Sequence, residues 1–117
     1  MNFLQKLREL SVERCEAYFF PLRAWSVLEW AGAAAGEAGE AANVAKKIRR
    51  HEVLCDNGKA VYDAAKMAKR RQDLGEEVAD TIIYLDLLCA SEGLDLEQVI
   101  RAKFNKVSVE YGFNKVL

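Results

Sequence analysis

The sequence has little proline, few cysteines and no long apolar run. Pro21 is its only proline in 117 residues. Long proline-free stretches with helical spacing of apolar residues indicate an all-α protein. The three cysteines lie far apart in the sequence and include no Cys-x-x-Cys pair. This pattern argues against a disulfide framework and favours reduced thiols in a cytoplasmic protein.

Targeting segments and a strong net charge are also missing. The first ten residues, MNFLQKLREL, carry scattered charges and no continuous apolar segment, so no signal peptide is predicted. No stretch approaches the roughly 20 apolar residues that a membrane span needs. The net charge of −1 gives no general reason to expect binding to a nucleic acid polymer or a membrane. We therefore expect neither partner.

The length favours one domain over residues 1–117, with a core small enough to benefit from a subunit interface. The charges are unevenly distributed. Residues 44–71 hold nine Lys or Arg and three acids, whereas residues 72–97 hold eight acids and no Lys or Arg. This arrangement suits a site where cations and carboxylates meet a phosphate–metal complex, although two solvated helix faces of opposite sign would give the same pattern.

The local signals predict a helical bundle. A helix that begins near Phe3 stops before Pro21, and Asp56-Asn57-Gly58 is a turn signal. Gly93 is a candidate C-terminal cap, and Asp95 with Gln98 three residues later opens a last helix. The expected helices cover about 3–19, 24–51, 60–70, 72–91 and 96–111.

Two of these helices have unusual content. From Ala31 to Ala42, only Glu37 and Glu40 are larger than alanine. Such a run predicts a tight helix–helix contact, in which the two carboxylates would lie in a partly dry crevice. The helix over 72–91 is apolar around most of its circumference, so we expect it to be central in the bundle.

Four acids form the main candidate site. Glu37 and Glu40 are three residues apart and project from one helix face, and Glu77 and Asp80 do the same on another helix. Like charges this close repel each other unless a cation lies between them. Oxygen ligands without sulfur or imidazole select Mg²⁺, with Mn²⁺ as a substitute. Ordinary surface acids are the alternative.

The motifs then resemble a known family. Gly36-Glu37-Ala38-Gly39-Glu40, followed by Glu76-Glu77-Val78-Ala79-Asp80, resembles the ExxE…ExxD signature of MazG-like proteins, which are all-α nucleoside triphosphate pyrophosphohydrolases. Residues 43–47 and 100–108 also resemble stretches of that family. The similarity spans about residues 24–112. One departure is the 36 residues between Glu40 and Glu77, which suggest an added segment at about 52–71.

The resemblance implies a four-helix-bundle-type MazG-like fold that assembles as a homodimer or homotetramer. It implies Mg²⁺-dependent hydrolysis of a (deoxy)nucleoside triphosphate to the monophosphate and pyrophosphate, in house-cleaning of the nucleotide pool. The quartet Glu37, Glu40, Glu77 and Asp80 would bind the metal. Glu37 or Glu40 is the expected general base for the attacking water.

Further residues are candidates for substrate contact. By resemblance, Tyr84 would touch the base or sugar, and Lys103 and Asn105 would lie near the phosphates. Asn43 continues the acidic face by one step of three residues, and Lys47 belongs to a basic run that could reach a phosphate. Packing at a helix interface or a solvated face would also explain each of them.

Aromatic and polar residues elsewhere have simpler interpretations. Trp25 could stack on a nucleobase or anchor the core. Glu76 and Asp86 are expected to be surface salt-bridge residues. His51 and Cys55, four residues apart, could form half of a zinc site, but no second pair accompanies them.

Two alternative functions stay open. One is a related dUTP- or phosphoribosyl-ATP-directed pyrophosphohydrolase on the same scaffold. The other is a non-catalytic helical module that uses its acids to bind a structural metal or a partner.

Overall fold

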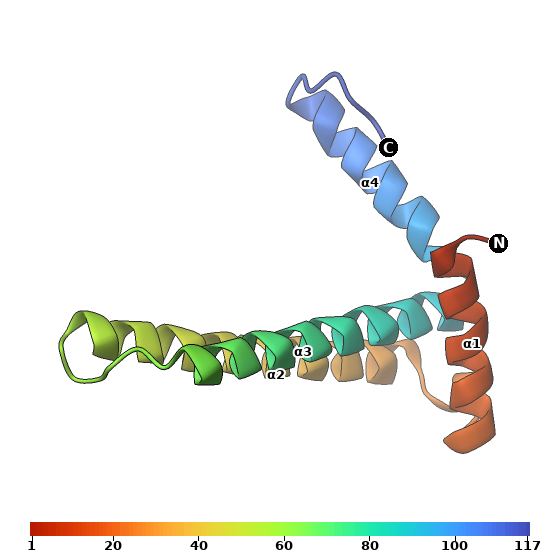
Figure 1. The fold of residues 1–117 in the computed structure, drawn as a ribbon. Coiled ribbons are helices and arrows are strands. Elements are labelled where there is room, and N and C mark those ends of the chain that lie inside the picture. The colour runs from red at the N-terminus through yellow and green to blue at the C-terminus, as the bar shows by residue number, and fades with distance from the viewer. The chain divides into compact units, whose positions relative to one another are not determined.

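The computed structural model describes residues 1–117 and contains four α-helices, one short 3-10 helix and no strand (Figure 1). The predicted all-α class is therefore confirmed. The chain divides into two compact units, one formed by Leu28–Leu85 and the other by Met1–Val27 with Asp86–Leu117. The single domain over 1–117 stays a prediction. The elements are α1 (Phe3–Tyr18), η1 (Leu22–Ala24), α2 (Val27–Asp56), α3 (Ala64–Ser91) and α4 (Leu96–Glu110).

The unit of residues 28–85 is a hairpin in which α2 and α3 run side by side in opposite directions (Figure 1). The predicted turn is confirmed, since α2 ends at Asp56 and Gly58 has a φ of 69°, which favours glycine. Beyond the turn, the Asp63 carboxylate accepts a hydrogen bond from the Lys66 N–H at 2.9 Å. The Asp63 N–H donates to Nε2 of His51 at 3.1 Å, which ties the start of α3 back to α2.

Helix α3 differs from its prediction. Two helices, over about 60–70 and 72–91, were expected, but one helix runs unbroken from Ala64 to Ser91. No proline or turn residue interrupts Arg70-Arg71-Gln72-Asp73, and the ion pair between Lys69 and Asp73 spans the expected break. Such a pair, four residues apart, supports a continuous helix.

The interior of the hairpin is narrow. Trp30 and Met67 are its most deeply buried large side chains, and the Trp30 ring lies 6.3 Å from that of Tyr84 between centroids. Val78 and Ile82 on α3 remain 49% and 41% exposed. Within the hairpin, α3 is therefore not enclosed at the centre of a bundle as expected, because two helices cover only one side of each other.

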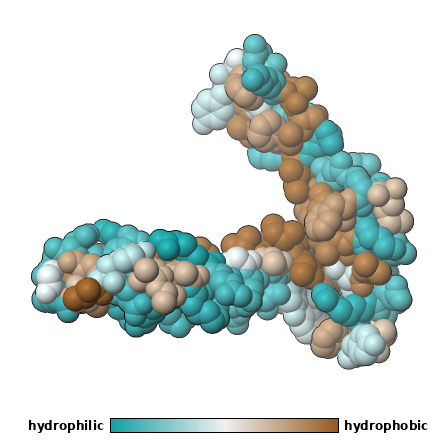
Figure 2. All heavy atoms as spheres, viewed as in Figure 1, coloured by the Kyte–Doolittle hydropathy of each residue, from teal (hydrophilic) through white to brown (hydrophobic).

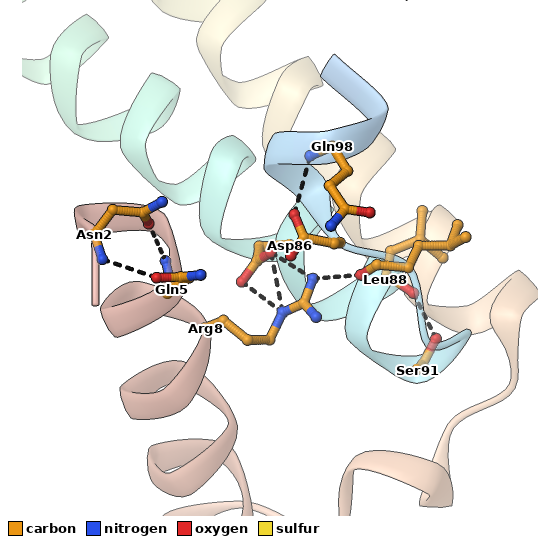
Figure 3. A network of polar contacts seen from close by, with 9 residues as sticks. Asn2, Gln5, Arg8, Asp86, Leu88, Ser91 and Gln98 are labelled. Atoms are coloured by element: carbon orange, nitrogen blue, oxygen red, sulfur yellow. Dashed lines mark hydrogen bonds and ion pairs between the residues drawn. The ribbon is translucent and has the colours of Figure 1, made fainter. Parts of the chain in front are cut away.

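The unit of residues 1–27 and 86–117 is held by a buried ion pair (Figure 3). The Arg8 guanidinium donates to both carboxylate oxygens of Asp86, at distances of 2.7 to 3.1 Å, and to the Leu94 carbonyl at 2.8 Å. The prediction of a surface salt bridge for Asp86 is wrong in its location, because Asp86 is only 2% exposed. Glu76, by contrast, is exposed as expected and forms no ion pair.

The ends of helices in this unit follow the sequence signals. Asn2 and Gln5 form a capping box at the start of α1. Gly93 has a φ of 69° after α3, and Asp95 accepts from the Gln98 N–H at 3.0 Å to begin α4, as predicted. Figure 2 shows hydrophobic residues along α4, where Ile100 and Phe104 are exposed. None of the helices combines the length and the apolar character that crossing a membrane requires.

Candidate metal centre

Three of the four predicted acids converge in the hairpin. Glu37 and Glu40 project from α2, one turn apart, and Glu77 projects from α3. Each offers a carboxylate oxygen, and these three atoms all lie within 4.8 Å of one another. The antiparallel pairing of α2 and α3 thus brings together carboxylates that are far apart in the sequence. We call Glu37, Glu40 and Glu77 the acidic trio.

The electrostatics of the trio favour protonation when no cation is present. Partial burial, followed by the charges of Glu40 and Asp80, raises the pKa of Glu37 above its ordinary value. A side-chain hydrogen bond with Glu40 is the largest cause of the raised pKa of Glu77, and desolvation and the neighbouring charges add to it. Neighbouring carboxylates contribute to both shifts after these larger causes, so negative charge is crowded at this point.

One oxygen of the trio lacks a partner. Oε2 of Glu77 is shielded from solvent and has no hydrogen-bond partner. The nearby Thr81 hydroxyl does not supply one, because it donates to the Glu77 main-chain carbonyl at 2.8 Å. Buried polar atoms are almost always satisfied in folded proteins. An all-oxygen donor set with an unsatisfied oxygen fits a hard divalent cation such as Mg²⁺.

Asp80 stands apart from the trio. Its side chain is exposed and does not belong to the group of converging oxygens. Its negative charge still contributes to the raised pKa values of Glu37 and Glu77. The structure therefore brings three of the predicted ligands together and leaves the fourth at the margin.

The small residues around the trio pack on one side only. Ala34 is buried, at 4% exposure. A Cβ atom added at Gly32, Gly36 or Gly39 would meet no atom within 4 Å. The tight helix contact predicted for the whole run from Ala31 to Ala42 is therefore not formed at the glycines within the hairpin, where α3 does not cover them.

Three of the predicted substrate-contact residues lie on the same hairpin as the acidic trio. Asn43 and Lys47 are exposed on α2, in the turns that follow Glu40. Tyr84 is partly buried and its ring contacts that of Trp30, so it has a packing role whatever else it does. The exposed Asn43 side chain and Lys47 ammonium form no hydrogen bond or ion pair within the chain, so both are free to meet a ligand.

The other three predicted substrate-contact residues belong to the unit of residues 1–27 and 86–117. The Trp25 ring lies 4.8 Å from that of Phe20 between centroids, which is an aromatic contact of the type that anchors a core. Lys103 is exposed on α4. The Asn105 side chain accepts from the Leu117 N–H at 2.8 Å and lies 3.4 Å from the Leu117 carbonyl, so its amide is engaged with the C-terminal residue.

The hairpin also contains a cavity that the sequence did not reveal. Its volume is about 170 Å³, and it is lined by Lys47, Arg50, His51, Leu54, Lys66 and Arg70. Lys66 and Arg70 were missed because they fall in the segment treated as an addition. Their spacing of four residues, on a helix facing a basic run, was the available signal.

His51 and Cys55 do not form an open metal site. The Cys55 sulfur lies 3.6 Å from Nε2 of His51, but the same nitrogen accepts the hydrogen bond from the Asp63 N–H. Nε2 therefore serves the turn of the hairpin rather than a zinc ion.

Comparisons of the chain with protein-family models, with curated proteins and with solved structures found no match. The resemblance to MazG-like proteins stays a prediction from the motifs.

Proposed function

We propose that the chain is a MazG-like pyrophosphohydrolase that uses Mg²⁺ to cleave a (deoxy)nucleoside triphosphate into the monophosphate and pyrophosphate. Mn²⁺ would substitute for Mg²⁺. The role would be house-cleaning of the cytoplasmic nucleotide pool. The observation that carries this proposal is the acidic trio, in which three carboxylates converge and Oε2 of Glu77 lacks a partner.

The trio supports a hard-cation site on chemical grounds. Crowded carboxylates with raised pKa values for Glu37 and Glu77 gain stability when a divalent cation replaces their protons. Mg²⁺ prefers few protein carboxylates and completes its ligands with water and substrate phosphates. Asp80, at the margin of the trio, would join through water or after a small rotation of its side chain.

Different residues of the hairpin would have different roles in the proposed hydrolysis. The bound metal would neutralise phosphate charge and lower the pKa of a water molecule. Glu37 or Glu40, whichever is less engaged with metal, would accept the proton of the attacking water. Asn43 and Lys47 would bind phosphate oxygens, and Tyr84 would border the base or sugar. Trp25, Lys103 and Asn105 belong to the other unit, so their contact with substrate stays a prediction from the sequence alone.

A homodimer or homotetramer is part of this proposal. Val78 and Ile82 remain substantially exposed on α3, and Ile100 and Phe104 do so on α4. Burial of such side chains between copies of the chain would add the hydrophobic stabilisation that a narrow two-helix core lacks.

Pyrophosphate release tests the function. Purified protein is incubated with each common and several modified (d)NTPs, with Mg²⁺, with Mn²⁺ and with EDTA. We expect metal-dependent release of pyrophosphate from at least one substrate. Substitutions Glu40→Gln and Glu77→Gln should lower kcat/KM about 100-fold or more.

Glu76→Gln is the matched control, because Glu76 is an exposed acid beside Glu77 and outside the trio. It should change kcat/KM by no more than about twofold. The substrate panel, extended to dUTP and phosphoribosyl-ATP, separates the related hydrolases. No release from any substrate, together with Mg²⁺ binding that Glu77→Gln removes, would favour the non-catalytic metal-binding module.

A further inference from the structure

A second cluster of charged residues lies on the same hairpin, nearer to its turn. We propose that the cavity lined by Lys47, Arg50, Lys66 and Arg70 binds a multiply charged phosphate anion without the help of a metal. The ligand class is an oligophosphate, either free pyrophosphate or the phosphate chain of a nucleotide. This anion site does not depend on the proposed hydrolysis.

The composition of the cavity carries the inference. Of its six lining residues, four carry a positive charge and none carries a negative one. The cations come in two pairs, Lys47 with Arg50 on α2 and Lys66 with Arg70 on α3, and each pair lies on one face of its helix. The like charges of these residues repel each other, and the attraction of a bound polyanion would offset that repulsion.

These cations have no acidic partner, unlike two of the neighbouring cations. Lys47, Arg50 and Lys66 form no ion pair. The adjacent Arg49 pairs with Glu52 at 3.2 Å, and Lys69 pairs with Asp73. The four cations that line the cavity are thus left without an acidic partner, whereas Arg49 and Lys69 outside it are paired.

Arg70 has a fixed position in the cavity. Its Nη1 donates to the Lys47 main-chain carbonyl at 2.7 Å, which ties its guanidinium to α2. The group has further N–H donors that this bond does not use. A guanidinium held in place loses less entropy when it binds a phosphate, and its planar donors match phosphate oxygens.

His51 lines the cavity and is held in place by a hydrogen bond from the turn of the hairpin. His51 is 8% exposed, and its Nε2 accepts the hydrogen bond from the Asp63 N–H. Asp63 is the nearest acid by sequence to Lys66, but its carboxylate accepts from the Lys66 N–H and caps α3. This acid therefore serves the helix end, and it does not belong to the cavity lining.

The size and the charge of the cavity select the ligand. A volume of about 170 Å³ suits a small anion rather than a nucleobase with its sugar. Four cations exceed what a single carboxylate could neutralise, so pyrophosphate or a di- or triphosphate group fits better.

The cavity and the acidic trio lie on the same two helices, a short distance apart along the helix axes. Lys47 is seven residues beyond Glu40 on α2, and Arg70 is seven residues before Glu77 on α3. Seven residues make about two turns, so each pair shares a helix face and is separated by about 10 Å. A nucleotide whose metal-bound phosphate lies on the trio could therefore direct anionic groups toward the cavity, or a free anion could occupy it alone.

Calorimetric titration with sodium pyrophosphate in EDTA tests the site directly. We expect saturable binding that weakens with added salt. Lys66→Gln and Arg50→Gln should each weaken it about tenfold or more, because each removes a charge-assisted hydrogen bond. The matched controls Lys46→Gln and Lys69→Gln should change it by no more than about twofold. Circular dichroism confirms that each variant folds.

A second arm identifies the source of the phosphate. A non-hydrolysable nucleoside triphosphate is titrated with Mg²⁺ into wild type, Lys66→Gln and Glu77→Gln. Weaker binding in both variants supports one nucleotide that spans the trio and the cavity. Weaker binding in Glu77→Gln alone, with pyrophosphate binding in EDTA preserved, supports a separate site for the free anion.

Two results would overturn the proposal. One is the absence of any effect of Lys66→Gln and Arg50→Gln on pyrophosphate binding in EDTA, together with no effect of Lys66→Gln on nucleotide binding. The other is an equal loss of pyrophosphate affinity in Lys46→Gln, which would show diffuse charge attraction rather than a built site. Neither result depends on catalysis, so the anion site and the hydrolase can fail independently.

Discussion

The ion pair between Arg8 and Asp86 gives the most direct test of how the unit of residues 1–27 and 86–117 is held together. The Asp86 side chain is 3% exposed and that of Arg8 is 27% exposed. The hydrogen bond to Asp86 is the largest cause of the raised pKa of Arg8. In Arg8→Met, a buried carboxylate would lose its counter-charge and its guanidinium donors together.

The expected cost of Arg8→Met is about 3–5 kcal/mol, the range for breaking a buried pair by removing one partner. For a chain of this length, that loss corresponds to a fall in melting temperature of about 10–20 °C. Urea and thermal unfolding followed by far-UV circular dichroism measure it. Arg101→Met is the control, because its pair with Glu97 is exposed and should contribute no more than about 0.5 kcal/mol.

A double substitution tests whether the lost stability comes from the buried carboxylate that Arg8→Met leaves unpaired. In Arg8→Met with Asp86→Leu, no charge stays buried, so most of the lost stability should return. If Arg8→Met alone costs less than about 1 kcal/mol, or if the second substitution adds to the loss, the reasoning about an uncompensated carboxylate is wrong.

Two further predictions concern the hairpin. In EDTA, the raised pKa values of Glu37 and Glu77 mean that the folded chain binds protons more tightly than the unfolded chain, so their contribution to stability falls as the pH rises from the ordinary value of 4.5 through the raised values. Urea midpoints of wild type should therefore decline relative to those of Glu77→Gln between mildly acidic and neutral pH, and parallel midpoints would contradict this. Gly36→Ala should stabilise the chain by about 0.5–1 kcal/mol in urea unfolding, since an added Cβ meets nothing and the unfolded chain loses freedom. A loss of stability would instead indicate that another chain covers this side of α2.

Signals local to one helix predicted much of the structure. Asp95 with Gln98 predicted the start of α4, and Gly58 predicted the turn of the hairpin. The spacing of Glu37 and Glu40 put both carboxylates on one face. These predictions hold because capping, turn geometry and helical periodicity depend on a few neighbouring residues.

Features that depend on contacts between distant residues were not predictable in the same way. The burial of Asp86 depends on Arg8, which is 78 positions away in sequence. The cavity needs Lys66 to lie opposite Arg50, and only the pairing of α2 with α3 brings them together. The exclusion of Asp80 from the trio likewise follows from how the two helices face each other rather than from its position three residues after Glu77.

The positions of the acidic trio and the cationic cavity affect how a charged ligand is oriented as it approaches the protein. Negative charge in the middle of the hairpin and positive charge near its turn create an electric dipole along the helix axes. A small ligand that carries a metal ion at one end and bare phosphate at the other would rotate to align with this field as it approaches. The ligand would thus be oriented before it binds. Added salt would slow its productive association as well as weaken its binding.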